Sequence, residues 1–160
     1  MFQLQTTELK DFQNWKQSNS QKFFSLYEYT NGVIQVNELS SDICIAFLRL
    51  IYPPFLCFNE CIFLADEYHQ DKLDKLVCQG YKLKELEYWM NLLNLDCYFR
   101  TDKEDFSLTK CLFFAHELKK IWMQKLSGDF PTRKFDVSCI QDVDPDTQAE
   151  EVYITLCQVE

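Results

Sequence analysis

The sequence predicts an α+β fold, with an antiparallel or mixed sheet built from three β-hairpins and helices packed mainly on one face. Three observations lead to this prediction. Paired short segments with strand-like patterns alternate with helical segments, in the order α-ββ-α-ββ-ααα-ββ. Hydrophobic residues make up 47% of the 160 residues, which is enough for a full core, and only 3 Gly and 4 Pro interrupt the chain. We therefore expect a single α+β domain over residues 1–160.

The first two elements are predicted to be a helix and a hairpin. Thr6 or Thr7 can cap a helix whose apolar residues follow near-helical spacing and which ends around residues 18–20. In the next segment, Asn31-Gly32 predicts a two-residue hairpin turn, because both residue types tolerate a positive φ. This register places mainly apolar residues on one face of the hairpin and mainly polar residues on the other.

The segment between Ser40 or Ser41 and Pro53-Pro54 predicts a second helix. Apolar residues occupy nearly all of its sides, so we expect it to be the central helix, packed on a sheet. A second hairpin is predicted to turn at Asn59-Glu60. Its strands are apolar on both faces, which is typical of strands in the interior of a sheet.

Three helices and a terminal hairpin are predicted for the rest of the chain. The first helix ends at Gly80, the second places Glu85 and Glu87 on its exposed face, and the third ends at Ser127-Gly128. The third helix is the longest, and its predicted buried stripe consists of Leu108, Cys111, Leu112, Ala115, Leu118, Trp122 and Leu126. Residues 133–142 and 151–160 then alternate with a period of two, which predicts two strands joined by a loop.

The charge balance favours some classes of partner over others. The chain has 25 acidic and 16 basic residues, a net charge of −9, so nothing supplies the basic face that binding to nucleic acid phosphates requires. An anionic membrane would also repel it, whereas a basic protein would be attracted. The first residues lack the features of a signal peptide, and no apolar stretch is long enough to span a bilayer. We therefore expect a soluble, intracellular protein.

Negative charge is concentrated at the C-terminal end. From Phe135 onward there is no Lys or Arg, and the acidic residues are Asp136, Asp142, Asp144, Asp146, Glu150, Glu151 and Glu160. Acidic side chains on an edge strand discourage unwanted strand pairing, which would explain the pattern by itself. They could equally form a recognition surface for a positively charged protein.

The cysteines do not predict a metal site. The eight cysteines are spread along the chain, and most of them lie in apolar or alternating segments, which is typical of small buried hydrophobes. Cys57 and Cys61 come closest to ligand spacing, but a two-residue turn at Asn59-Glu60 would point their sulfurs to opposite faces. A three-residue loop would bring them together, so this exclusion depends on the register.

Motifs for other chemistry are incomplete. His69 lies at a predicted helix start, and His116 follows Cys111 by five residues, a spacing that does not bring helical side chains together. No glycine-rich phosphate-binding motif is present, so we expect no cofactor. The spacing of Asp142, Asp144 and Asp146 superficially resembles a calcium loop, but the required glycine and closing glutamate are missing.

In size, acidity, α+β make-up and lack of catalytic motifs, the chain resembles the bacterial immunity proteins of polymorphic-toxin and contact-dependent growth-inhibition systems. This resemblance implies a cytoplasmic antitoxin that binds and neutralises a cognate toxin protein. Many such toxins are basic nucleases, whose nucleic-acid groove an acidic surface would occlude. The residues predicted to bind the partner are Asp142, Asp144, Asp146, Glu150 and Glu151, with a second patch at Asp102, Glu104 and Asp105.

Two alternatives remain open. The first is a small thiol-dependent enzyme that uses Cys111 or another cysteine with His116. The second is a regulatory or scaffolding module in which Tyr88, Trp89 and Tyr98 are exposed anchors. The sequence leaves the partner's identity and the oligomeric state open.

Overall fold

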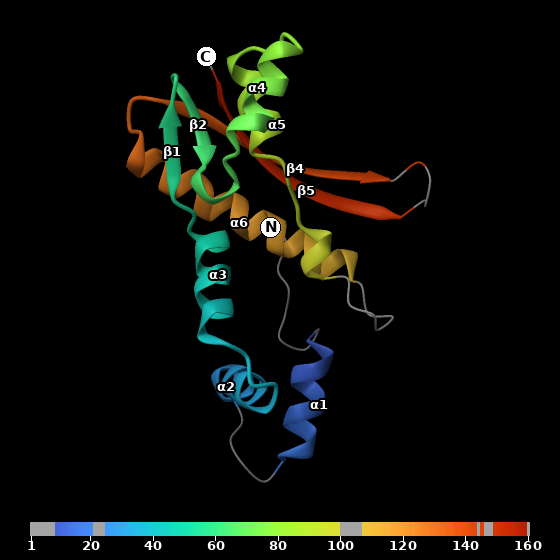
Figure 1. Cartoon of the computed structure of the whole chain (residues 1–160). Helices are drawn as coiled ribbons and strands as arrows, with labels where there is room; N and C mark the ends of the chain where they lie inside the picture. The colour runs from blue at the N-terminus through green and yellow to red at the C-terminus, as the bar shows by residue number, and fades with distance from the viewer. Residues whose placement is uncertain (1–8, 21–24, 100–106, 144, 146–148, 160) are drawn as a thin grey trace. The chain divides into compact units, whose positions relative to one another are not determined.

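The computed structural model describes residues 9–20, 25–99, 107–143, 145 and 149–159 (Figure 1). By its internal contacts the chain divides into two compact units, residues 1–48 and residues 49–160. The division falls within one helix, α3 (Ser41–Ile51). The single-domain organisation stays a prediction, and the two units are described separately.

The first unit contains α1 (Lys10–Ser18), α2 (Leu26–Val36) and most of α3. The predicted first helix is confirmed as α1, which has Leu9 at its N-cap position, while the predicted caps Thr6 and Thr7 lie outside the described residues. The hairpin at Asn31-Gly32 is wrong, because both residues lie inside α2. A capping box starts this helix: Ser25 Oγ accepts a hydrogen bond from the Glu28 N–H at 3.2 Å, and the Ser25 N–H donates to Glu28 Oε2 at 2.8 Å. This local signal outweighs the turn preference of Asn-Gly.

Gly32 serves packing in this helix. A Cβ atom added at Gly32 would lie 2.7 Å from Trp15 Cζ3, so the missing side chain lets the indole ring approach α2. The rings of Phe12 and Trp15 also meet Tyr29 edge to face, with centroids 5.6 and 5.5 Å apart. These edge-to-face contacts between aromatic rings therefore join α1 to α2.

The helix predicted before Pro53-Pro54 is confirmed as α3, but its predicted central position is wrong. None of its residues is buried, and Ile45 and Leu48 are 56% and 57% exposed. Only its last turn joins a core: Leu50 and Ile51 pack against the main core of the second unit. Apolar composition alone therefore did not determine which helix is enclosed.

The second unit is α+β, as predicted, with two small antiparallel sheets in place of one sheet of three hairpins. One sheet has the order β1-β2 and the other has the order β3-β5-β4. Its elements are β1 (Phe55–Phe58), β2 (Cys61–Leu64), α4 (Gln70–Cys78), α5 (Leu83–Met90), β3 (Leu93–Asn94), α6 (Leu108–Asp129), β4 (Lys134–Val143) and β5 (Glu150–Val159).

The hairpin at Asn59-Glu60 is confirmed. Phe58 pairs with Cys61 across a two-residue turn, and both turn residues have positive φ, at 48° and 68°. The strands are not interior to a larger sheet as predicted, since this sheet has two strands. β2 is nevertheless buried along its whole length, because its alternate residues enter two different cores.

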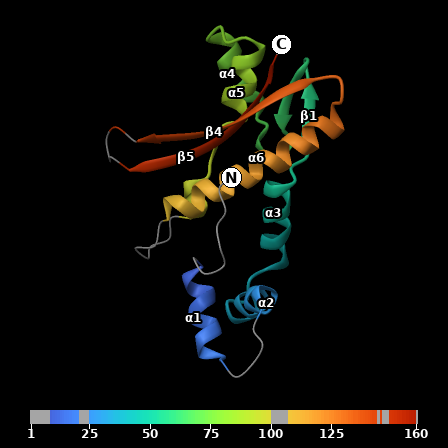
Figure 2. The same cartoon turned by 180° about the vertical axis from the view of Figure 1, so that it is seen from behind.

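Helices cover both faces of β5, so the prediction of helices mainly on one face is not met. The predicted stripe of α6 packs against Val137, Ile154 and Leu156 in the main core. On the opposite face of β5, Thr155 Oγ1 donates a hydrogen bond to the Tyr88 carbonyl oxygen of α5 at 2.7 Å. Figures 1 and 2 show α6 and α5 on different sides of the β4–β5 ribbon.

The remaining helix ends follow local rules. Gly80 has a φ of +88° and ends α4, with its N–H bonded to Val77 O and that of Tyr81 bonded to Leu76 O, as in a Schellman motif. α5 ends at Met90, earlier than its apolar pattern suggested, because Leu93 pairs with β5. Among the described helices, none combines the length and apolarity that a membrane crossing needs.

Candidate functional site

Three of the predicted partner-binding residues lie at the end of the β4–β5 hairpin where β4 finishes and β5 begins. Asp142 and Glu150 are exposed, and Glu151 is half-buried. The other predicted residues, Asp144, Asp146, Asp102, Glu104 and Asp105, lie outside the described residues. Figures 1 and 2 both show this end of the ribbon extending beyond α5.

The strand register brings two carboxylates face to face. Asp142 lies directly opposite Glu151, so both side chains project from the same face of the ribbon. Asp136 lies further along β4 on that face and accepts a hydrogen bond from Ser138 Oγ at 2.7 Å. None of these three carboxylates forms an ion pair with a Lys or Arg in the described part of the chain. Like charges directly opposite one another destabilise a sheet.

Tyr153 shows the electrostatic effect of this charge. Its hydroxyl donates a hydrogen bond to Glu151 Oε2, two residues away on the same face. This hydrogen bond, with partial burial and the negative charge of Glu151, raises the pKa of Tyr153 to about 12. The phenol is therefore a neutral hydrogen-bond donor to Glu151 at physiological pH.

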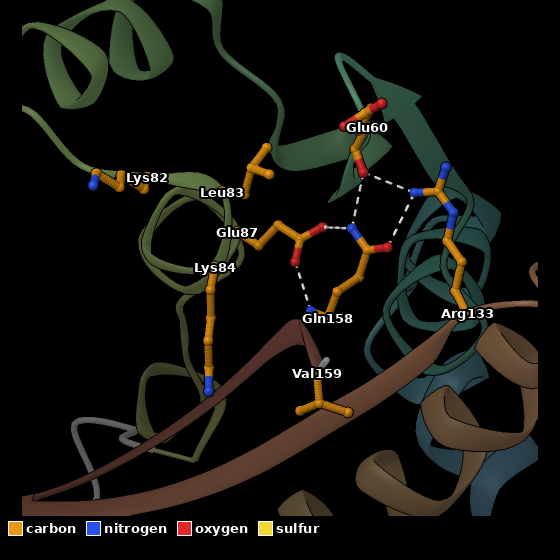
Figure 3. A pocket seen from close by; sticks show the side chains of 8 residues that line it. All are labelled: Glu60, Lys82, Leu83, Lys84, Glu87, Arg133, Gln158 and Val159. Atoms are coloured by element: carbon orange, nitrogen blue, oxygen red, sulfur yellow. Dashed lines mark hydrogen bonds between the residues drawn. The ribbon is translucent and has the colours of Figure 1, made fainter.

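A pocket of about 790 Å³ lies at the opposite end of the same hairpin (Figure 3). Its lining residues come from the β1–β2 turn, α5, the segment before β4 and the end of β5: Glu60, Lys82, Leu83, Lys84, Glu87, Arg133, Gln158 and Val159. Figure 3 shows Glu87 and Gln158 facing each other in its wall, with Lys82 and Lys84 extending away from Glu87.

Glu87 is fully buried, which corrects the prediction that it lies on an exposed face. Its Oε1 accepts hydrogen bonds from the Ile62 N–H at 2.7 Å and from Gln158 Nε2 at 2.6 Å. Its Oε2 accepts from the Gln158 N–H at 2.6 Å. One turn further along α5, Asn91 Oδ1 accepts from the Leu64 N–H at 2.8 Å. These two side chains thus accept the hydrogen bonds that the N–H groups of β2 would otherwise donate to a third strand.

The sequence did contain a signal for this arrangement. Glu87 and Asn91 are separated from Leu83 by four and eight residues, and Leu86 and Met90 follow Leu83 by three and seven. All five therefore share one helical face. Two polar residues inside an apolar stripe indicate buried groups that need partners.

Arg133 completes the polar wall of the pocket. Its Nη1 donates to the Glu60 carbonyl oxygen at 2.7 Å and to Gln158 Oε1 at 3.1 Å. Gln158 Nε2 donates to the same Glu60 oxygen at 2.8 Å. The groups thus satisfy one another and tie the β1–β2 turn to the end of β5, which is the arrangement of a structural network.

Four thiols, those of Cys61, Cys97, Cys139 and Cys157, have raised pKa values, which is the opposite of what an activated nucleophile needs. Burial, together with the charge of Glu87, raises the pKa of Cys61 to about 11, although Arg133 acts in the opposite direction. Burial also raises the pKa values of Cys97, Cys139 and Cys157. In the thiol-enzyme alternative, Cys111 is completely buried whereas His116 is exposed on the same helix.

The β1–β2 register decides the question of the Cys57 and Cys61 spacing. Cys57 pairs with Ile62 and Phe58 pairs with Cys61, so the two sulfurs point to opposite faces, as expected for the two-residue turn. Cys61 is buried and Cys57 is exposed. Within the described residues, no three His, Cys, Asp or Glu side chains are grouped so that they could hold a metal ion.

Comparisons with protein-family models, with curated proteins and with solved structures found no match to this chain. The geometry of the site therefore carries the functional argument.

Proposed function

We propose that this protein is an immunity-type inhibitor, which binds a basic cognate toxin domain in the cytoplasm through the acidic end of its β4–β5 hairpin. The observation that carries this proposal is the directly opposed pair Asp142 and Glu151, which has no ion-pair partner in the described part of the chain. A net charge of −9 adds long-range attraction for a basic partner.

Folding alone gives no reason for this pair. Two like charges on opposing residues lower the stability of the sheet, by an amount on the order of a few tenths of a kcal/mol at an exposed site. Protection of an edge strand needs charge along that strand but does not need a second carboxylate facing it. A Lys or Arg from a partner would relieve the repulsion, so binding would remove the destabilisation that these two carboxylates cause in the free protein.

The class of partner follows from the same chemistry. A toxin that acts on nucleic acid must present a basic groove to the phosphate backbone. An acidic hairpin end would compete for that groove and exclude the substrate. Association would then be fast at low ionic strength and would slow steeply as salt is added.

The experiment isolates the basic partner by affinity capture at low salt and then measures its association with the wild type and with the double variant Asp142→Asn/Glu151→Gln. We expect association in stopped-flow measurements to be about tenfold slower at low salt, because two steering charges are removed. The difference should shrink at higher salt, while the thermal stability of the free protein stays the same or rises.

The matched control is Asp71→Asn/Asp74→Asn, which makes the same change in net charge on α4. If this control slows association as much as the hairpin variant does, net charge acts without a defined site and the proposed surface is wrong. An unchanged association rate in the hairpin variant would also exclude the proposed surface.

A further inference from the structure

The outer edge of β4 has backbone hydrogen-bonding groups that none of the described strands uses. In the sheet order β3-β5-β4, β4 is an edge strand of ten residues, Lys134–Val143. The pairing register and the hydrogen bonds of β5 show which residues of β4 point their backbone groups outward.

Even-numbered residues of β5 point their backbone groups away from β4. The Val152 carbonyl oxygen accepts a hydrogen bond from the Leu95 N–H at 2.7 Å, and the Leu156 carbonyl oxygen accepts from Asn91 Nδ2 at 3.2 Å. The Gln158 N–H likewise donates to Glu87. In an antiparallel pair the N–H and C=O of one residue point to the same side, so the odd-numbered residues of β5 bond to β4.

The pairing register shows which residues of β4 bond to β5 and which point outward. Glu151 pairs with Asp142 and Tyr153 pairs with Ile140, so the even-numbered residues of β4 form the ladder with β5. The residues whose backbone groups point to the open side are therefore Phe135, Val137, Cys139, Gln141 and Val143. The hydrogen bond from the Val143 N–H to Asp142 Oδ1, at 2.8 Å, agrees with this assignment.

We propose that this open edge of β4 takes an extended, basic segment of the partner as an additional strand. Phe135 and Val137 are buried, so the accessible part of this edge runs from Cys139 to Val143, and this part is a template for strand addition. Its side chains favour one occupant, because Asp142 projects from β4 here and Glu151 lies directly opposite Asp142. Alternating Lys or Arg residues in an added strand would lie beside these acids.

A second copy of this chain is the competing occupant, and the net charge of −9 on each copy opposes it. The inference rests on the proposed function in that both need a basic partner. It goes further in specifying backbone pairing, which charge attraction alone does not require.

The test uses a short synthetic peptide of alternating Lys and Val, titrated into the full-length protein at low salt. Two control peptides carry N-methyl groups on the backbone nitrogens of all Lys residues or of all Val residues. An added strand bonds through alternate residues only, so one control should bind as the parent does. The other should bind about tenfold or more weakly, because it loses several hydrogen bonds.

Amide hydrogen exchange then reports the location. We expect the parent peptide to protect the outward N–H groups of Cys139 and Gln141, whereas the N–H groups that bond to β5 change little. On the protein side, Gln141→Pro removes one outward donor and spares the ladder with β5. It should weaken peptide binding about five- to tenfold relative to the matched variant Gln141→Thr, which keeps the N–H.

Equal binding of all three peptides would overturn the edge inference and leave the acidic surface intact, since attraction by charge alone would explain it. Absence of peptide binding would also overturn it. Protection of the outward amides that appears without peptide, as protein concentration rises, would assign the edge to a second copy instead. The proposed function is tested by a separate result: it is wrong if toxin association does not depend on Asp142 and Glu151.

Discussion

The two compact units differ in how much of their apolar surface they bury. Among the described residues of the first unit, Phe12 alone is buried, and Tyr27 and Val36 are 89% and 71% exposed. The second unit encloses Trp122, Ile154 and many other residues almost completely. Both units form helices with good caps and helical periodicity. Local signals therefore suffice to form a helix, but they do not determine whether its apolar face is covered.

The largest expected effect on the free energy of unfolding comes from removing the indole ring of Trp122 from the core of the second unit. Trp122 is completely buried in the main core, and its Nε1–H donates a hydrogen bond to the Leu50 carbonyl oxygen at 3.1 Å. Trp122→Ala should lower the free energy of unfolding by about 4 kcal/mol, because it leaves a large cavity and an unpaired acceptor. The matched change in the first unit, Ile45→Ala, should cost no more than about 0.5 kcal/mol.

Urea denaturation followed by circular dichroism measures both variants. A similar loss of stability in the two would show that α3 is covered in solution, and it would contradict the contrast between the units.

The next largest effect concerns the buried carboxylate of the second unit. Glu87→Ala leaves the Ile62 N–H and the Gln158 N–H without their acceptor, so we expect a loss of about 3 kcal/mol. Glu85→Ala, on the exposed side of the same helix, should cost about 1 kcal/mol or less, through its contact with the Lys82 N–H. Denaturant unfolding compares the two, and equal losses would show that the network adds no stability.

In the first unit, the sharpest test is Gly32→Ala. Helix propensity alone would make this change stabilising by about 1 kcal/mol. The added Cβ would instead collide with the ring of Trp15, so we expect a net loss of about 1 kcal/mol and weaker α1–α2 contacts. In a Trp15→Ala background the same substitution should become stabilising. Thermal unfolding of the four proteins gives this cycle, and the absence of a sign reversal would contradict the packing role of Gly32.

The smallest effect is a pH dependence located in β2. Because the pKa of Cys61 is raised to about 11 from its usual 9.0, the folded protein retains this proton at a pH where the unfolded chain releases it. The stability contributed by the protonated thiol is complete below pH 9 and should fall as pH rises towards 11. Denaturation at pH 8 and pH 10 should show this decrease in the wild type and a smaller one in Cys61→Val.

Thiol labelling provides an independent check of the same residue. At pH 8, a maleimide should modify the exposed Cys57 and spare the buried Cys61 in the folded protein. Rapid modification of Cys61 would show that the hairpin opens readily.

Sequence patterns predicted most of the second unit because its signals were local or strictly periodic. Examples are the stripe on α6, the turn at Asn59-Glu60 and the stop at Gly80. Of the candidate site, the two alternating strands were predictable from their period of two. Their pairing register was not predictable, so no sequence pattern placed Asp142 opposite Glu151.

The errors have a common physical origin. Gly32 was interpreted through backbone freedom, whereas its role depends on the indole ring of a residue in another helix. Glu87 is predicted from the helical pattern to lie on the exposed face with Glu85, whereas three donors from β2 and β5 satisfy its buried carboxylate. In both cases the deciding partner is distant in sequence.

The sequence by itself determined the α+β class, the net charge of −9 and the acidic character of the C-terminal segment, because composition and short-range periodicity are local properties. Only the tertiary structure decided which apolar helix is enclosed, which glutamate is buried and which edge of β4 is open. These features depend on contacts between segments far apart in the chain, and their free energies are set by burial and by hydrogen-bond partners that no local pattern specifies.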